Sequence, residues 1–274
     1  MRIAIQGELG SFSHEMAQRF APEATIVACA LSAEVFGAVD AGDVDAAVIP
    51  IENSLAGSVA EHYDLLLTHD VAIESESLLQ IRHNLIAMTG VALEQVERVY
   101  SHPVALAQCR RFLAAHPRME VTPFYDTAGS VKQIMERRDA KAAGIASTQA
   151  AKQYRGRILA EGIEDNAENY TRFFLIRQRR FVKPDLRPDK VSLAFTVENR
   201  PGTLVKALEV FANQGTNLTR IESRPVQGRP WEYVFYADYQ LSAPETADAA
   251  LELLAEHCSM VRELGRYRGA VRTF

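Results

Sequence analysis

The chain has 274 residues, of which 47% are hydrophobic and 24% are charged, and its formal net charge is −5. This composition is typical of a globular protein with one large or two smaller domains, and it argues against nucleic-acid binding, which needs a basic surface. Three widely separated cysteines indicate free thiols in a reducing compartment, without metal-ligand spacing. The N-terminus lacks a signal-peptide pattern and no apolar run is long enough to span a bilayer, so we expect a cytoplasmic protein.

Strand-like and helix-like patterns alternate through the first two thirds of the chain and predict a mainly parallel α/β sheet covered on both faces. Two chain crossings divide this part into two lobes with a cleft between them, lobe 1 being about 1–77 and 164–180, and lobe 2 about 78–163. The expected strands are 2–6, 25–28, 46–50, 72–77, 79–87, 99–100, 121–125, 144–146, 158–160 and 173–176, and the expected helices are 14–20, 32–41, 58–67, 104–115, 131–136 and 147–154.

The last third of the chain has a different pattern. A proline-containing, charged stretch at 181–190 is typical of a linker between domains. Expected strands at 191–197, 217–224, 231–239 and 260–267 and helices at 204–214 and 244–256 give the order βαββαβ, which is the ferredoxin-like unit. Such a unit has an open sheet face and free edges, so we expect it to dimerise.

Two turns in lobe 1 are candidates for ligand binding. The glycine-containing turn 7–13 leads into a helix that Ser11 or Ser13 caps, so it is either an anion site at a helix N-terminus or an ordinary strand–helix connection. Three polar residues, Glu52, Asn53 and Ser54, follow a buried strand, where ligands bind in open α/β sheets. The alternative is a segment in which Ser54 or Ser58 only caps the next helix.

Two further stretches carry groups suited to chemistry. His102, held extended before a proline, is either a general acid or a turn residue, and we favour a positioning role. Thr171 and Arg172 stand before the apolar run 173–176, where they either face a cleft and hold an anion or are an ordinary loop threonine and surface arginine.

Five motifs in this order resemble the prephenate dehydratase family, and the C-terminal part resembles an ACT regulatory domain. The motifs are GELGSFS at 7–13, PIENSLAGSV at 50–59, YSHPVALAQC at 100–109, YDTAGSV at 125–131 and NYTRFFLI at 169–176, followed by NRPGTLVKAL at 199–208 and ESRP at 222–225. The resemblance covers nearly the whole chain, and because its motifs are not preceded by a chorismate mutase pattern in this sequence, we expect the monofunctional form. It implies a two-lobed catalytic domain (1–180) like that of periplasmic binding proteins, followed by an ACT domain (191–274).

The resemblance also implies the reaction and its residues. Prephenate would lose carbon dioxide and water to give phenylpyruvate, in phenylalanine biosynthesis, without a metal or organic cofactor. The family's catalytic positions fall on Thr171, Asn53, Ser101, Gln108 and Glu52, and we expect substrate contacts from Ser11, Phe12, Ser54, His102, Arg172 and Phe173. As a hypothesis, Thr171 hydrogen-bonds the departing hydroxyl and supplies its proton, Arg172 and the helix start at Ser11 hold the side-chain carboxylate, and Phe173 forms an apolar wall.

For regulation, the resemblance implies that phenylalanine binds between the ACT domains of two subunits in a homodimer or homotetramer. The expected contact residues are Asn199, Pro201, Gly202, Thr203, Leu204, Asn217, Leu218, Glu222, Ser223, Arg224 and Pro225. Thr203 departs from the alanine that is usual in that turn. Two alternatives remain: the same chemistry on arogenate, whose side chain carries an ammonium group, and a non-catalytic amino-acid sensor.

Overall fold

The computed structural model describes residues 1–226, 228–241, 243 and 246–270. The chain forms two compact units, residues 1–62 with 78–173 (unit 1) and residues 63–77 with 174–274 (unit 2). Helix α3 (Ala60–Thr68) and strands β5 (Val71–Gln80) and β11 (Tyr170–Gln178) each have residues in both units. None of the helices in the described part of the chain has the length and apolar character that a membrane span requires.

The first lobe of unit 1 is built around a parallel sheet with β1 (Arg2–Gln6) at its centre, next to β2 (Thr25–Cys29) and β3 (Ala46–Asn53). The connecting helices are α1 (Phe12–Phe20) and α2 (Ser32–Ala41), and β4 (Gly57–Ser58) pairs with the end of β3. Consecutive apolar residues of both strands, 3–5 in β1 and 46–49 in β3, are fully buried, as expected for a parallel sheet covered on both faces. Helix α1 begins where predicted because the Ser11 hydroxyl caps it by accepting the N–H of His14.

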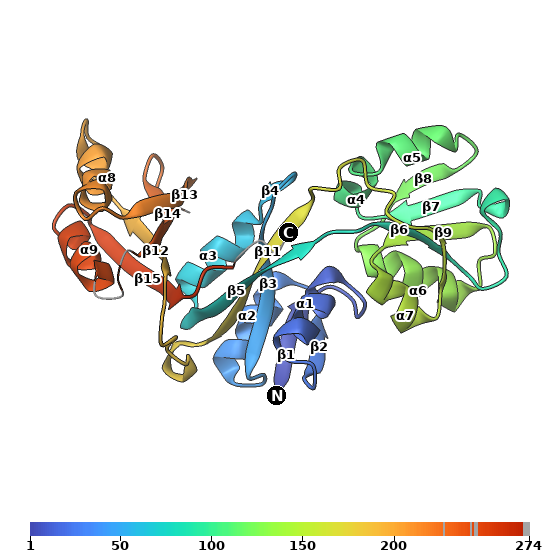
Figure 1. Cartoon of the computed structure of the whole chain (residues 1–274), viewed down its shortest axis with the longest axis horizontal. Helices are drawn as coiled ribbons and strands as arrows, with labels where there is room; N and C mark the ends of the chain where they lie inside the picture. The colour runs from blue at the N-terminus through green and yellow to red at the C-terminus, as the bar shows by residue number, and fades with distance from the viewer. Residues whose placement is uncertain (227, 242, 244–245, 271–274) are drawn as a thin grey trace. The chain divides into compact units, whose positions relative to one another are not determined.

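The second lobe of unit 1 is a five-stranded sheet in the order β10-β6-β9-β7-β8 with helices on both faces (Figure 1). Its strands are β6 (Asn84–Ala87), β7 (Arg98–Ser101), β8 (Glu120–Pro123), β9 (Ala142–Ala146) and β10 (Arg157–Ala160), and its helices are η1 (Leu93–Gln95), α4 (Pro103–Ala107), α5 (Arg110–Ala115), α6 (Thr127–Arg137) and α7 (Thr148–Tyr154). Apolar side chains of α4 and α5 pack on one face, and those of α6 and α7 on the other.

The helix expected over residues 104–115 is two helices in the structure. Gln108 and Cys109 leave helical geometry, and α5 starts again at Arg110. The carboxylate of Asp165 accepts the N–H groups of Arg110 (3.0 Å) and Arg111 (2.9 Å), so it caps the second helix from a distant part of the chain. The apolar periodicity runs through the break, which is why the sequence alone does not indicate it.

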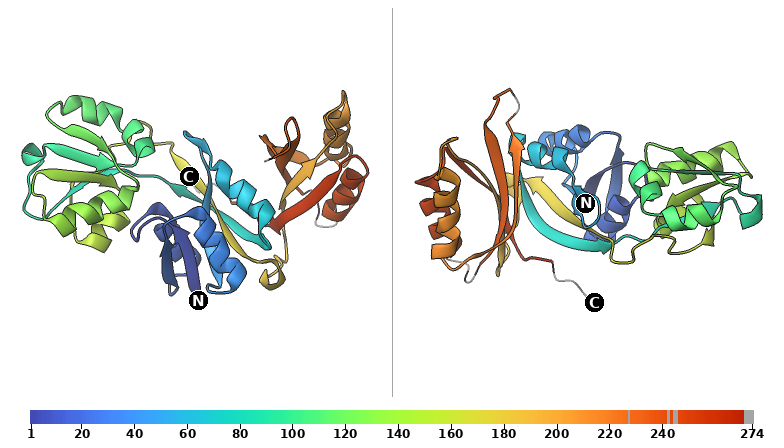
Figure 2. Two further views of the ribbon diagram at one scale, coloured as in Figure 1. Left: turned by 180° about the vertical axis from the view of Figure 1, so that it is seen from behind. Right: turned by 90° about the horizontal axis from the view of Figure 1, so that it is seen from above.

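The C-terminal residues of unit 2 have the predicted order βαββαβ. The elements are β12 (Lys190–Thr196), α8 (Thr203–Asn213), β13 (Asn217–Pro225), β14 (Tyr233–Gln240), α9 (Thr246–Ala255) and β15 (Met260–Tyr267), after the short helix η2 (Arg179–Phe181). Both helices pack on the same face of the sheet β13-β14-β12-β15 (Figure 2). The expected fold class is confirmed. The predicted helix start at Pro244, and Gln227 in the predicted turn, lie outside the described residues.

The other face and one edge of this sheet, which we expected to be open, are contacted by residues 63–77 of the same unit. Strand β5 lies beside β15, with Ile73 opposite Gly265, where a Cβ atom would overlap Ile73. The ring of Tyr63 lies 5.0 Å from that of Tyr236, centroid to centroid. The edge strand β13 has β14 as its one strand neighbour among the described residues.

Candidate active site

Unit 1 contains a cavity of about 860 Å³. Its walls come from the β1–α1 turn, the end of β3, the loop that leads into α3, the chain crossing at 81–83, the start of α4, residues 125–127 and the start of β11. Both lobes therefore contribute to it, as expected for a ligand site of an open α/β fold. No group of three or more metal-ligating side chains occurs in the described part of the chain.

Asn53 is the centre of a network of neutral hydrogen bonds beside the cavity. Its Oδ1 accepts the N–H groups of Leu55 (3.0 Å) and Ala56 (2.8 Å), so the orientation of its amide is fixed by the backbone. Its Nδ2 donates to Asn169 Oδ1 (2.8 Å) and to Thr171 Oγ1 (3.0 Å). The Thr171 hydroxyl accepts at its oxygen, and its own proton is left to point to another acceptor.

Gln108 and His83 continue this network. Gln108 Nε2 donates to Asn53 Oδ1 (3.4 Å), so its Oε1 is the atom that accepts from Asn169 Nδ2 (3.0 Å) and from His83 Nε2 (2.9 Å). His83 therefore carries its proton on Nε2, and burial lowers its pKa, which keeps the ring neutral. The other nitrogen, Nδ1, is buried and has no hydrogen-bond partner among the residues that the structure describes.

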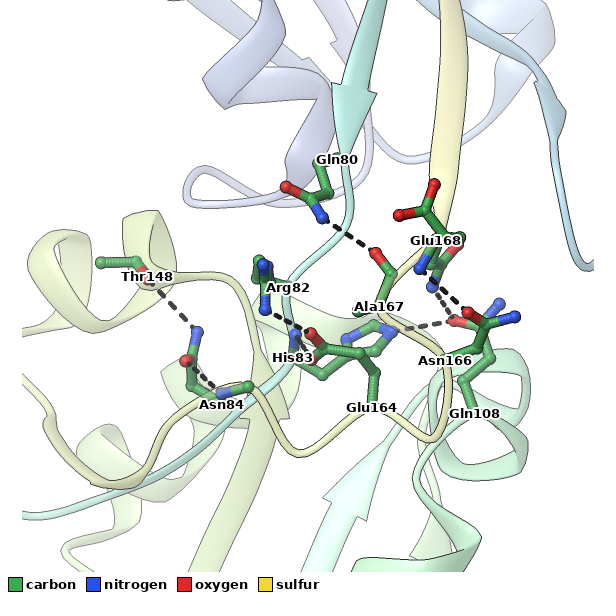
Figure 3. A network of polar contacts seen from close by, with 12 residues as sticks. Gln80, Arg82, His83, Asn84, Gln108, Thr148, Glu164, Asn166, Ala167 and Glu168 are labelled. Carbon is green, nitrogen blue, oxygen red and sulfur yellow. Dashed lines mark hydrogen bonds and ion pairs between the residues drawn. The ribbon is translucent and has the colours of Figure 1, made fainter. Parts of the chain in front are cut away.

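The two chain crossings that carry these residues lie side by side and are tied by side-chain contacts (Figure 3). Gln80 Nε2 donates to the carbonyl of Ala167 (2.8 Å), and Arg82 lies 3.3 Å from Glu164. The carboxylate of Glu164 also accepts the backbone N–H of His83 (2.8 Å). These contacts fix the backbone of His83 in position beside the network.

Thr171 and Phe173 both line the cavity from β11. Side chains alternate along a strand, so Arg172 between them lies on the other face of β11, and it is not part of the cavity wall. The same alternation on β3 places Asn53 in the wall and Glu52 outside it. The cavity wall therefore gives no support to the substrate contact predicted for Arg172 or to the catalytic role predicted for Glu52.

Two predicted serines are also outside the cavity wall. Ser101 is fully buried, and its hydroxyl donates to the carbonyl of Ile145 (2.6 Å), between β7 and β9. The Ser54 hydroxyl bonds backbone groups of Glu168 (3.2 Å) and Tyr170 (3.0 Å). Both hydroxyls hold the surrounding chain together in this structure.

Three predicted substrate residues do line the cavity: Ser11, Phe12 and His102. Ser11 and Phe12 form the N-terminal end of α1, where backbone N–H groups without a helical partner favour an anion. The ring of Phe12 meets the ring of His83 edge-on, with centroids 5.7 Å apart. His102 caps α4, since its Nδ1 accepts the N–H of Val104 (3.3 Å).

The sequence analysis missed several polar residues of the wall, among them His83, Glu8 and Asp126. Asp126 caps α6 by accepting the N–H of Gly129 (2.7 Å), and burial raises its pKa. The only sequence signal for His83 is a histidine inside the apolar stretch 79–87. Glu8 and Asp126 fall within the quoted motifs at 7–13 and 125–131, but neither was singled out there as a site residue.

The residues expected to bind phenylalanine lie at the N-terminal end of α8 and on β13, in unit 2. Gly202 has a left-handed backbone conformation directly before α8, and the Thr203 hydroxyl donates to the carbonyls of Glu198 (2.6 Å) and Arg200 (2.8 Å). The other predicted residues adjoin this turn or lie on β13: Asn199, Pro201 and Leu204 in the first group, and Asn217, Leu218, Ser223 and Pro225 in the second.

Two side chains of the ESRP motif, Glu222 and Arg224, form ion pairs within unit 2. The guanidinium of Arg224 donates to both carboxylate oxygens of Asp64 in α3, at 2.9 and 2.6 Å. Glu222 forms an ion pair with Arg220, whose guanidinium lies over the ring of Tyr63, 4.2 Å from its centroid. The motif thus connects β13 to α3.

Comparison with known proteins identifies the family. The prephenate dehydratase model matches residues 3–180, and the ACT domain model matches residues 191–238. The chain is 41% identical to an arogenate dehydratase/prephenate dehydratase of Arabidopsis thaliana, over 97% of this chain and 72% of that one. It is 37% identical to the bifunctional chorismate mutase/prephenate dehydratase of Aquifex aeolicus, over 99% and 74%.

Two solved structures are similar over nearly the whole chain. The prephenate dehydratase of Arthrobacter aurescens in complex with L-Phe has a TM-score of 0.89 at 32% identity and covers 98% of this chain and 90% of that one. A protein described as a quorum-quenching acylase, GqqA, has a TM-score of 0.90 at 32% identity and 98% coverage of both chains. The chain belongs to the prephenate dehydratase family, the hydro-lyases that carry a C-terminal ACT domain.

Proposed function

We propose that this chain catalyses the decarboxylating dehydration of prephenate to phenylpyruvate, and the same step on arogenate to give phenylalanine. In this reaction the bond between the ring and its carboxylate breaks, and its electron pair enters the ring. The ring carbon–hydroxyl bond breaks at the opposite side, and one proton joins the leaving hydroxyl to form water. Because the ring becomes aromatic, the enzyme needs to assist the departure of the hydroxyl and to leave the carboxylate poorly solvated.

The observation that carries this proposal is the position of the Thr171 hydroxyl. It lines the cavity, and it accepts a hydrogen bond from the fixed amide of Asn53. That bond directs the threonine proton toward a different acceptor and stabilises negative charge on the oxygen as the proton leaves. We assign Thr171 as the donor to the departing hydroxyl, with Asn53 and Gln108 as positioning residues.

The other walls of the cavity suit the rest of the substrate. Phe173, which is 1% exposed, provides an apolar wall for the ring carboxylate, where poor solvation favours the loss of carbon dioxide. The free N–H groups at the start of α1, next to Ser11 and Phe12, suit the side-chain carboxylate.

The test is an assay of the purified full-length protein with prephenate, following phenylpyruvate by its absorbance. We expect turnover without added metal ion or cofactor, and a parallel assay with arogenate should give phenylalanine. A protein that is folded by circular dichroism and converts neither compound would overturn the proposal.

We further propose that L-phenylalanine binds between the ACT sheets of two copies of this chain, in a homodimer or a dimer of dimers. The complex of the Arthrobacter aurescens relative with L-Phe supports an effector site. The β13 edge and the exposed apolar side chains Val205, Ile221 and Trp231 support pairing with a second copy. Sedimentation and activity measured in the same phenylalanine titration test both the pairing and the binding of phenylalanine.

We also propose a cytoplasmic location for the protein. The three unpaired cysteines support it.

A further inference from the structure

The charge of the cavity is unusual for a site that receives carboxylate groups. Among the described residues that line it, two are carboxylic acids, Glu8 and Asp126, and none is a lysine or an arginine. Of the two histidines in the wall, His102 accepts a backbone N–H at its Nδ1 atom, and burial lowers the pKa of His83. The wall therefore offers negative charge, together with the dipoles of helix starts.

The two acids differ in their partners. Glu8 is compensated, because Lys132 Nζ lies 2.9 Å from one carboxylate oxygen and the Tyr125 hydroxyl donates to the other (2.8 Å). Asp126 forms no ion pair with a lysine or arginine in the described part of the chain. One of its oxygens, Oδ1, caps α6 at Gly129 (2.7 Å). Asp126 thus lacks a lysine or arginine partner of the kind that Glu8 has, and the nearby ring of His102 and the N–H groups at the start of α6 are the groups that favour its charged form.

The second oxygen of Asp126 lies close to the β1–α1 turn. A Cβ atom built on Gly7 would be 2.7 Å from Asp126 Oδ2, so the glycine leaves the space that the carboxylate occupies. Gly7 begins the turn that leads to Ser11 and the anion-binding start of α1. A carboxylate therefore lies against the first residue of a turn that ends at a positive helix start, and these two kinds of group suit the ammonium and carboxylate groups of an α-amino acid.

A separate observation concerns a buried nitrogen atom of a residue in the cavity wall. His83 is 2% exposed and lines the cavity, and its Nδ1 has no partner among the residues that the structure describes. A buried acceptor of this kind costs stability unless a ligand or a water completes it.

We propose that Asp126 binds the ammonium group of the substrate side chain and makes the enzyme prefer arogenate over prephenate. The inference rests on the proposed reaction and deepens it. Prephenate carries a keto group at the position where arogenate carries the ammonium group, so it gains nothing from a carboxylate there. Asp126 acts as a specificity-determining residue, while Thr171 serves both substrates.

The experiment compares kcat/KM for arogenate and prephenate in the wild type and in Asp126→Asn. Asparagine caps a helix as well as aspartate does, so α6 should remain intact. We expect the wild type to favour arogenate by about tenfold or more. The substitution should lower kcat/KM for arogenate about 10- to 100-fold, the usual size of a charged hydrogen bond, and leave the value for prephenate within about threefold.

Asp165→Asn is the matched control, because Asp165 also caps a helix of the second lobe but does not line the cavity. The ratio of the two kcat/KM values should be unchanged in this variant. An equal loss on both substrates in Asp126→Asn, or a wild type that prefers prephenate, would overturn the inference while leaving the proposed reaction intact. Absence of turnover with either substrate would overturn both.

Discussion

The network around Thr171 and the contacts of α3 in unit 2 use different kinds of interaction. The network consists of neutral hydrogen bonds, and two backbone N–H groups fix the orientation of the Asn53 amide at its centre; its members are Thr171, Asn53, Asn169, Gln108 and His83. A neutral network beside a cavity can orient a charged substrate without competing for its charge. The contacts of α3, in contrast, depend on guanidinium groups. Charged contacts between secondary-structure elements respond more readily to ligands, salt and pH.

Helix α3 is held by charged contacts. Arg224 holds Asp64, and Arg262 donates to the carbonyls of Leu67 and His69, the latter at 2.7 Å. Cationic groups near the C-terminal end of a helix are favourable because they complement its dipole. Residues 60–62 of the same helix belong to unit 1, directly after the loop that lines the cavity, so α3, like β5 and β11, continues from one unit into the other.

Introducing a charge into the neutral network should have the largest effect. In Asn53→Asp a carboxylate oxygen replaces Nδ2 and faces three acceptors: Asn169 Oδ1, Thr171 Oγ1 and the Tyr170 carbonyl (3.2 Å). We expect kcat to fall by at least about 10² with either substrate, together with a loss of about 1–3 kcal/mol in unfolding free energy. Steady-state kinetics and denaturant unfolding measure the two effects.

Gln108→Glu is the comparison for that variant. It removes one donor, Nε2, whose contact with Asn53 Oδ1 is long at 3.4 Å, and it keeps the Oε1 acceptor. Its loss of kcat should therefore be smaller than that of Asn53→Asp. Equal effects in both variants would contradict the central place that the structure gives to Asn53.

Removing charge from the α3 contacts should affect regulation and leave the basal reaction unchanged. Asp64→Asn weakens the two-bond contact with Arg224. We expect the phenylalanine concentration for half-maximal response to change severalfold, corresponding to about 1 kcal/mol of coupling, while kcat without phenylalanine stays within twofold. Activity measured against phenylalanine concentration is the readout.

Asp70→Asn provides the control in the same segment, since Asp70 is exposed and lies 3.7 Å from Arg179. It should leave the phenylalanine response unchanged. If Asp64→Asn responds to phenylalanine like the wild type, the contact between β13 and α3 has no part in regulation.

The smallest effect is expected from pH. Burial lowers the pKa of His14, His62 and His83 below the value of 6.5 that each has when unfolded. The unfolded state thus binds protons first, so unfolding free energy is at its full value above about pH 6.5 and falls as pH decreases below it. Each histidine adds a slope of up to about 1.4 kcal/mol per pH unit.

The His83→Gln variant should show a flatter decline than the wild type in denaturant unfolding between pH 7.5 and 5.5. The glutamine can still donate to Gln108 Oε1, so the comparison isolates the titration. Identical slopes in the two proteins would show that His83 is not the buried neutral ring that the structure indicates.

The sequence predicted the fold well where local signals decide it. The βαββαβ order, the cap at Ser11 and the strands of buried apolar residues follow from periodicity and turn chemistry. The break between α4 and α5 was missed because its cap, Asp165, is 55 residues away in the sequence. The contact of Arg224 with Asp64 was missed for the same reason, at a separation of 160 residues.

Only some of the predicted site residues reach the cavity, because residues that are adjacent in the sequence can lie on opposite faces of a strand. Thr171, Asn53, Gln108 and Phe173 reach the cavity, while Arg172 and Glu52 are next to them in sequence and lie outside its wall. Motif matching selects neighbouring residues together, but a strand presents alternate residues to opposite faces.

The most direct test of the central claim is kcat of Thr171→Val compared with Thr171→Ser and the wild type. Valine keeps the shape of threonine and removes the hydroxyl, while serine retains it. We expect Thr171→Val to lose about 10² or more in kcat on prephenate and on arogenate with little change in KM, and Thr171→Ser to keep most of the activity. A Thr171→Val protein with near-normal turnover would contradict the assignment of this hydroxyl as the proton donor.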